Sequence, residues 1–424
     1  MVEGRIAALV VFILVYALFV LLPNKRTVVA LCGAGLLMLL GVISPGDAAL
    51  AINWNVMGIF VGTLVVADIF MESRVPAYLA EVIVDKAKNT AWAILFLCIL
   101  TGFISAFVEN VATVLIVAPI AMSLAKKLRI NPTKMMIAIA VSSNLQGTAT
   151  LIGDPPSMLL GGFAKMNFMD FFFYHARPSI FFAVEIGAIT SFFVLYFIFG
   201  THRQKTALVS IEKVKSWVPT IGLVLLIVLL AGSSFFDTGF SYMAGVLCMI
   251  FGIGLIVWNK LTNGSSVIKG IKSLDWDTTF FLIGVFILVG SITLTGWIDT
   301  ISAYLSNLVG KDIFLGYTLI VFISVFVSAF VDNVPFLAAM LPVAISMSQR
   351  LGVNPSLFLF GLLIGASLGG NITPIGASAN IVACGMLRKE GYTVRFGEFV
   401  KIGLPFTLAA VTPAYLFVWL IWRN

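Results

Sequence analysis

The sequence predicts an all-α integral membrane protein made of two inverted-topology repeats. Composition is the first observation: of 424 residues, 60% are hydrophobic and 11% are charged, against about 25% charged residues in soluble domains. The second is that apolar runs of roughly 20 residues, enough to span about 30 Å of hydrocarbon, recur along the whole chain. The third is an internal repeat. Each repeat is expected to supply five transmembrane helices and one re-entrant helical hairpin.

The repeat consists of similar segments at a constant offset of 223 residues. SAFVEN at 105–110 corresponds to SAFVDN at 328–333, and TATLIG at 148–153 corresponds to NITPIG at 371–376. Unrelated sequences would not keep one register from the first pair to the second. We therefore infer a duplication.

The expected elements follow the same order in both halves. In the N-terminal repeat, 1–200, transmembrane helices are predicted at 6–22, 28–43, 54–71, 134–164 and 179–200, the fourth of them broken. After a linker at 201–216, the C-terminal repeat, 217–424, has its helices at 217–231, 239–258, 277–297, 356–387 and 402–421, again with the fourth broken.

Residues 92–124 are predicted to form the first re-entrant hairpin. One straight helix of this length would reach about 50 Å, too long for the bilayer, and two full crossings would need roughly 40 residues. The polar pair Glu109–Asn110 lies in the middle of the segment, where a turn inside the membrane would place it. The corresponding hairpin of the second repeat is expected at 314–347.

Because each repeat crosses the membrane an odd number of times, the second repeat is inserted upside down. Of the 26 Lys and Arg residues, 20 then fall on one side of the membrane and six on the other. The positive-inside rule places both termini outside, in a cell inner (plasma) membrane. Inverted repeats with helices broken at the midplane are typical of secondary transporters. The six residues of the outer side are Arg5, Lys165, Arg177, Lys311, Arg350 and Arg423.

Polar residues gather at the helix breaks and hairpin tips, and these are the candidate ion- and substrate-binding residues. They are Glu109, Asn110, Thr113, Asn144, Thr148, Thr150, Gly153, Asp154, Asp332, Asn333, Asn371, Thr373, Gly376, Ser378 and Asn380. Unwound backbone at this depth is tolerated where it lines a cavity, and half-helix ends there suit ions of either sign. Na⁺ is expected at Asn110 with Asp154 and at Asn333 with Asn371. No cofactor or structural metal is expected, because the two histidines lie in different connections.

Three candidates, Glu109, Asp154 and Asp332, are acids, and an intramembrane acid is a functional hypothesis by default. Asn, Ser and Thr in membrane helices often only hold helices together, so they carry less weight. No Arg or Lys is expected near the midplane, so the candidate site would bind a dianion poorly. Burial raises the pKa of a carboxyl group toward the working range. The predicted function is therefore proton-coupled cation antiport by alternating access, with H⁺ and Na⁺ as the coupling ions.

Other functions stay open at this point. One is efflux of arsenite or antimonite, which are uncharged hydroxides near neutral pH and would suit the polar Asn, Ser and Thr side chains. Another is proton-coupled transport of a small organic or inorganic anion. A channel would conduct without proton coupling. An enzyme is not expected, because the sequence contains no recognisable catalytic pair.

The segments SAFVEN, SAFVDN, GTATLIGDPPSML and LGGNITPIGASANIV resemble the ion-transporter superfamily, in the branch that holds arsenite pumps (ArsB), sodium–proton antiporters (NhaD) and the melanosomal P-protein. The resemblance implies a homodimer in the lipid bilayer, with a fixed scaffold and mobile transport domains that move as elevators around a small ion substrate. It implies no nucleic-acid partner. Related dicarboxylate carriers have Ser-Asn-Thr at both tips, whereas acids precede Asn110 and Asn333 here and Val follows, which argues against a sodium-coupled dicarboxylate role.

Overall fold

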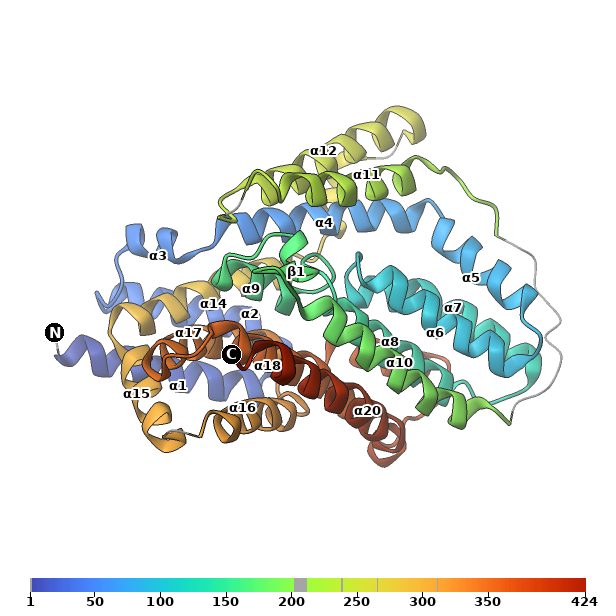
Figure 1. Cartoon of the computed structure of the whole chain (residues 1–424). Coiled ribbons are helices and arrows are strands. Elements are labelled where there is room, and N and C mark those ends of the chain that lie inside the picture. The colour runs from blue at the N-terminus through green and yellow to red at the C-terminus, as the bar shows by residue number, and fades with distance from the viewer. Residues whose placement is uncertain (1, 202–211, 238, 265, 311) are drawn as a thin grey trace.

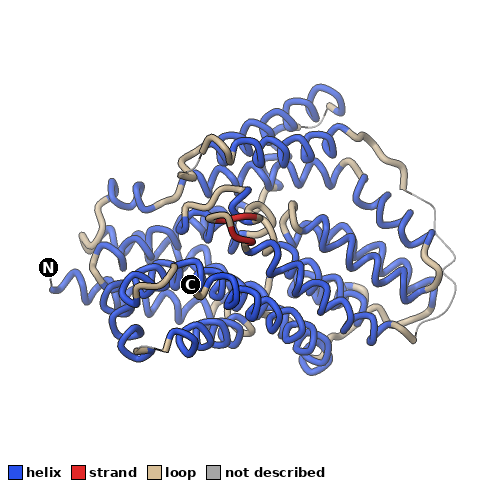
Figure 2. The backbone as a smooth tube through the Cα atoms, viewed as in Figure 1, coloured by secondary structure: helices blue, strands red, loops and turns tan. Residues whose placement is uncertain are grey.

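The computed structural model describes residues 2–201, 212–237, 239–264, 266–310 and 312–424, and nearly all of its regular structure is helical (Figure 2). Within these ranges the strands are β1 (Phe173–Tyr174) and β2 (Arg177–Pro178), which form one small antiparallel sheet. The predicted all-α class is confirmed apart from this hairpin. Residues 202–211 of the expected linker and Lys311 lie outside the described residues.

The helices of the second half follow the same order as those of the first (Figure 1). The first half contains α1 (Val2–Leu21), α2 (Arg26–Leu39), α3 (Pro45–Ala51), α4 (Trp54–Glu72), α5 (Val75–Lys86), α6 (Thr90–Ser105), α7 (Asn110–Leu128), α8 (Thr133–Gly147), α9 (Pro155–Ala164) and α10 (Ile180–Phe199). The second contains α11 (Val218–Ser233), α12 (Met243–Asn263), α13 (Val267–Ser273), α14 (Trp276–Leu294), α15 (Trp297–Val309), α16 (Ile313–Ser328), α17 (Asn333–Leu351), α18 (Pro355–Gly369), α19 (Ser378–Lys389) and α20 (Phe396–Trp422).

Helix lengths match between the halves where the sequence repeat is clearest. The helices α6 and α16 each have 16 residues, α7 and α17 each have 19, and α8 and α18 each have 15. Short 3-10 turns lie at Pro23–Lys25, Met169–Phe171 and Gly370–Ile372. The duplicated sequence thus produces a duplicated order of helices.

Nine helices among the described residues are long and apolar enough to cross a membrane, so the prediction of a multi-pass membrane protein is confirmed. Two of them, α7 and α17, were expected to be half-helices of re-entrant hairpins. Each continues through an internal proline, Pro119 or Pro342, for 19 residues, and the turn inside the bilayer stays a prediction. A proline removes one backbone hydrogen bond and kinks a helix, but in a membrane protein it does not have to end it.

Four short helices, α3, α5, α13 and α15, lie outside the predicted spans. With seven to 13 residues each, they are too short to cross about 30 Å of hydrocarbon. The helices α5 and α15 both follow directly after a long helix, α4 or α14, and both lead into the helix pairs α6–α7 and α16–α17. They are therefore a further feature that the two halves share.

The long helices pack through small residues. In Figure 1, α4, α11 and α12 lie together along one side of the molecule, and α4 contacts α12 closely. A Cβ atom on Gly62 would lie 2.3 Å from the backbone carbon of Cys248, and one on Gly58 would lie 3.0 Å from Gly245. Small residues that bring backbones into contact are the usual means of packing helices in a membrane.

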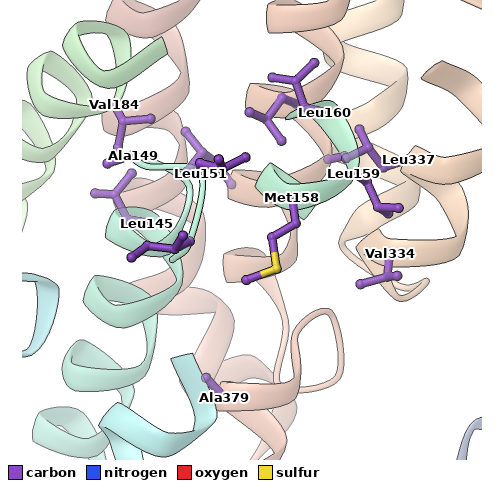
Figure 3. Close-up of a cluster of buried hydrophobic side chains, with 14 of the residues drawn as sticks. Leu145, Ala149, Leu151, Met158, Leu159, Leu160, Val184, Val334, Leu337 and Ala379 are labelled. Carbon is purple, nitrogen blue, oxygen red and sulfur yellow. The ribbon is translucent and has the colours of Figure 1, made fainter. Parts of the chain in front are cut away.

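The break between α8 and α9 is held by a buried apolar cluster (Figure 3). Leu151 of the break and Met158 and Leu159 of α9 are fully or almost fully buried. Leu159 lies beside Leu337 of α17, a helix that contacts α9. The unwound segment is thus fixed by packing on both sides, which positions the polar residues described next.

Candidate functional site

A threonine ties each helix break to a neighbouring tip. The first tip is the link between α6 and α7, and the second tip is the link between α16 and α17. The Thr150 hydroxyl donates a hydrogen bond to the carbonyl oxygen of Ala106, and the Thr373 hydroxyl donates to that of Ala329. The two bonds are related by the 223-residue offset. Both threonines were predicted as binding residues, but they are buried and bonded to backbone. They therefore hold the breaks against the tips.

Gly153 and Gly376 allow each break to close tightly. A Cβ atom on Gly153 would lie 2.3 Å from the carbonyl oxygen of Gly147, and one on Gly376 would lie 2.6 Å from that of Gly370. Any side chain at either position would collide with backbone. These two predicted residues therefore give each break its shape.

Three buried carboxamides join the two halves. Asn144 on α8 donates from Nδ2 to Oδ1 of Asn371 and to Oδ1 of Asn380, both at 2.9 Å. The Asn380 Nδ2 atom donates to the carbonyl oxygens of Gly370 and Thr373, which explains why its Oδ1 faces Asn144. The Nδ2 atom of Asn371 is buried and has no hydrogen-bond partner among the described residues.

The first tip presents an acid and an amide beside Asp154. Glu109 caps α7, because its carboxylate accepts a hydrogen bond from the backbone N–H of Ala112 at 3.0 Å. Asp154, only 1% exposed, caps α9 by accepting from the N–H of Ser157 at 2.9 Å. The side chains of Asn110 and Thr148 also hydrogen-bond to Asp154. A carboxylate at a helix N-terminus is favoured by the free N–H groups there.

Thr113 does not take part in this arrangement. Its hydroxyl donates to the carbonyl oxygen of Glu109 at 3.2 Å, and the residue is fully buried.

The second tip forms an ion pair that was not predicted. Asp332 caps α17 by accepting from the N–H of Val334 at 3.0 Å, and its carboxylate pairs with the Arg26 guanidinium at the start of α2. Arg26 also donates to Thr278 at 3.3 Å and lies over the Phe281 ring, 5.0 Å from its centroid. The expectation that no Arg or Lys lies near the site is therefore wrong. In the sequence, Arg26 follows Lys25 before an apolar run and looks like an ordinary flanking charge.

A cavity of about 110 Å³ lies between these groups. It contains six of the predicted residues, which are Glu109, Asn110, Asn144, Asp154, Asn333 and Ser378. Its other polar lining residues, Arg26, Asp275 and Thr278, were missed. Asp275 is exposed, so the cavity reaches the protein surface there. Asp275 caps α14, and the similarity of DWD at 275–277 to NWN at 53–55 is a sequence signal that could have identified it.

The helices α9 and α19 both begin at the cavity and differ in one respect. At the start of α9 Asp154 supplies a capping carboxylate, whereas α19 begins after Ala377 and has no side-chain cap. Ala377 is the repeat counterpart of Asp154 and lines the cavity together with Ser378 and Ala379. The N-terminus of α19 is therefore open to an anion.

The expected Na⁺ ligands are placed differently in the two halves. Asn110 and Asp154 hydrogen-bond to each other. Asn333 lines the cavity, whereas Asn371 belongs to the buried carboxamide cluster. Over the described ranges, no group of three or more His, Cys, Asp or Glu side chains has the geometry to hold a metal ion.

The chain resembles known transporters in sequence and fold. The uncharacterized transporter Rv2684 of Mycobacterium tuberculosis is 29% identical over 428 residues, which cover 98% of each chain. The P protein of Mus musculus is 25% identical over 97% of this chain and 60% of its own length, in agreement with the P-protein resemblance. The Alcanivorax borkumensis YdaH transporter has a similar fold, with a TM-score of 0.62, 15% identity and coverage of 90% of this chain and 87% of that one. The model of the CitMHS family, described as "Citrate transporter", matches residues 16–349 and 243–424, and this chain therefore belongs to the CitMHS citrate transporter family.

Proposed function

We propose that this secondary transporter carries a small carboxylate anion together with protons through the cavity between the two tips. The observation that carries the proposal is Arg26, the one basic side chain among the described residues that line the cavity. A guanidinium binds carboxylates in a planar, bidentate geometry. The family description, citrate transporter, supports the same substrate class.

The remaining groups of the cavity account for both the anion and the protons. The uncapped N-terminus of α19 offers N–H groups to a second carboxylate. Glu109 and Asp154, from the first half of the chain, also line the cavity. An entering carboxylate would be repelled by these acids unless they are protonated, because like charges at short range disfavour ionisation. Substrate entry and proton entry are thereby linked.

The test uses purified protein in proteoliposomes that contain a pH-sensitive dye. External citrate should acidify the lumen with wild-type protein, and Arg26→Gln should abolish the signal. Arg74→Gln is the matched control, because Arg74 forms an ion pair with Glu212 and does not line the cavity. A wild-type protein that gives no proton signal with mono-, di- or tricarboxylates would refute the proposal.

A second candidate is the cation antiport predicted from the sequence. It is favoured by the excess of acids in the cavity. Glu109, Asp154 and Asp275 line the cavity with a single guanidinium among the described residues, that of Arg26, which already forms an ion pair with Asp332. In the same assay, Na⁺ or Li⁺ would then move protons in the direction opposite to the cation. Arsenite and antimonite serve as a third arm, although no contact in the cavity favours them. A response to Na⁺ without a response to citrate would replace the first candidate by the second.

We propose that the halves are inverted repeats that alternate access by an elevator movement. The paired bonds of Thr150 and Thr373 and the matched helix lengths support the repeat. The pair α6–α7 returns the chain to the side from which it entered, whether it turns within the bilayer or beyond it, so each half still crosses an odd number of times. The homodimer, the inner-membrane location with both termini outside, the coupling ions, and the nearness to arsenite pumps and sodium–proton antiporters stay predictions.

A further inference from the structure

The ion pair between Arg26 and Asp332 joins the second tip to a helix from the other half of the chain. Arg26 is fixed from the α2–α14 side, because Thr278 and Phe281 of α14 hold its guanidinium and α2 packs on α14. Asp332 belongs to the link between α16 and α17. Their side chains are 22% and 28% exposed, and Arg26 lines the cavity, so a solute there can contact the guanidinium that Asp332 holds.

The first tip shows what the second would look like without this pair. Glu109 is the repeat counterpart of Asp332 and caps its helix in the same way. Among the ion pairs of the described residues, none involves Glu109. Capping therefore does not require the pair with Arg26, and the pair is an additional feature of one half.

We propose that Asp332 is an internal substitute for a carboxylate of the substrate. It occupies the guanidinium that the substrate needs, and the substrate binds by displacing it. The inference rests on the proposed function, and it assigns Asp332 a role in specificity. A neutral or cationic solute offers the guanidinium no replacement for Asp332, whereas a carboxylate restores the charge-assisted hydrogen bonds that displacement breaks. Displacement also releases the second tip from α2.

The experiment is calorimetric titration of the full-length protein in detergent with citrate. Asp332→Asn should bind citrate about tenfold more tightly than wild type, because competition for the Arg26 guanidinium is removed. Arg26→Gln should bind no citrate.

Two variants keep the result interpretable. Asparagine and serine are both good N-cap residues, so Asp332→Asn and Asp332→Ser each retain an acceptor for the Val334 N–H. Glu212→Gln, which breaks the ion pair with Arg74 away from the cavity, should leave the affinity for citrate unchanged. An affinity for citrate in both Asp332 variants equal to that of wild type would overturn the inference alone. Absence of binding of any carboxylate to wild type and to both variants would overturn the proposed function as well.

Discussion

The buried carboxamide cluster of Asn144, Asn371 and Asn380 should be a main source of stability. Replacing Asn144 with alanine removes two hydrogen bonds of 2.9 Å and leaves the Oδ1 atoms of Asn371 and Asn380 buried without a donor. An unsatisfied buried polar group costs about 1–3 kcal/mol, while side-chain hydrogen bonds in membrane proteins average about 0.6 kcal/mol. Asn144→Ala should therefore lower the free energy of unfolding by about 1–3 kcal/mol.

The repeat supplies the control for this measurement. Ser367 is the counterpart of Asn144 at the 223-residue offset, and its buried hydroxyl has no hydrogen-bond partner among the described residues. Ser367→Ala should leave the free energy of unfolding unchanged or raise it slightly, because no bond is lost. Unfolding of both variants and wild type is followed in mixed micelles by tryptophan fluorescence. Equal stability of the two variants would refute the assignment of the cluster.

Three further changes test other parts of the account. Asp154→Asn keeps an acceptor for the α9 N-terminus but loses the charge. The variant should therefore fold, but citrate should no longer move protons in the dye assay. Full proton movement would exclude Asp154 from coupling. Gly153→Ala should lower the melting temperature strongly, because its Cβ would lie 2.3 Å from a backbone oxygen. Gly254→Ala should not lower it, because no atom lies within 4 Å of that Cβ position. Equal melting temperatures of the two variants would contradict the role of Gly153 in the break. Cysteines at Lys127 and Arg350 should react with membrane-impermeant reagents from opposite faces, and labelling from one face would contradict the inverted topology.

Sequence reasoning found Glu109 and Asp154, two of the three acids that line the cavity in the described part of the chain, because a carboxylate in an apolar run is conspicuous. Glu109 and Asp154 are expensive in a membrane unless they serve a purpose, and the repeat pointed to Asp332 and Asn333 as counterparts of Glu109 and Asn110. The duplicated helix order could be predicted for the same reason. These inferences need only local sequence and the register between the halves.

The remaining features depend on contacts between distant segments. Arg26 lies at the start of a helix, where basic residues commonly flank a span, and only the approach of α14 and the second tip turns it toward the cavity. A threonine such as Thr150 has the same hydroxyl whether it binds a solute or a carbonyl oxygen, so its role could not be predicted. Helix length alone does not place the turn between α6 and α7 relative to the bilayer, because α7 continues through Pro119 for 19 residues.

The central claim is that carboxylate transport is coupled to protons through the acids of the cavity. It is tested most directly by the accumulation of radiolabelled citrate in proteoliposomes under an imposed pH gradient. Wild type should concentrate citrate in the lumen when the outside is more acidic, and Glu109→Gln should equilibrate citrate without concentrating it. Accumulation that follows a Na⁺ gradient and ignores the pH gradient would contradict the claim.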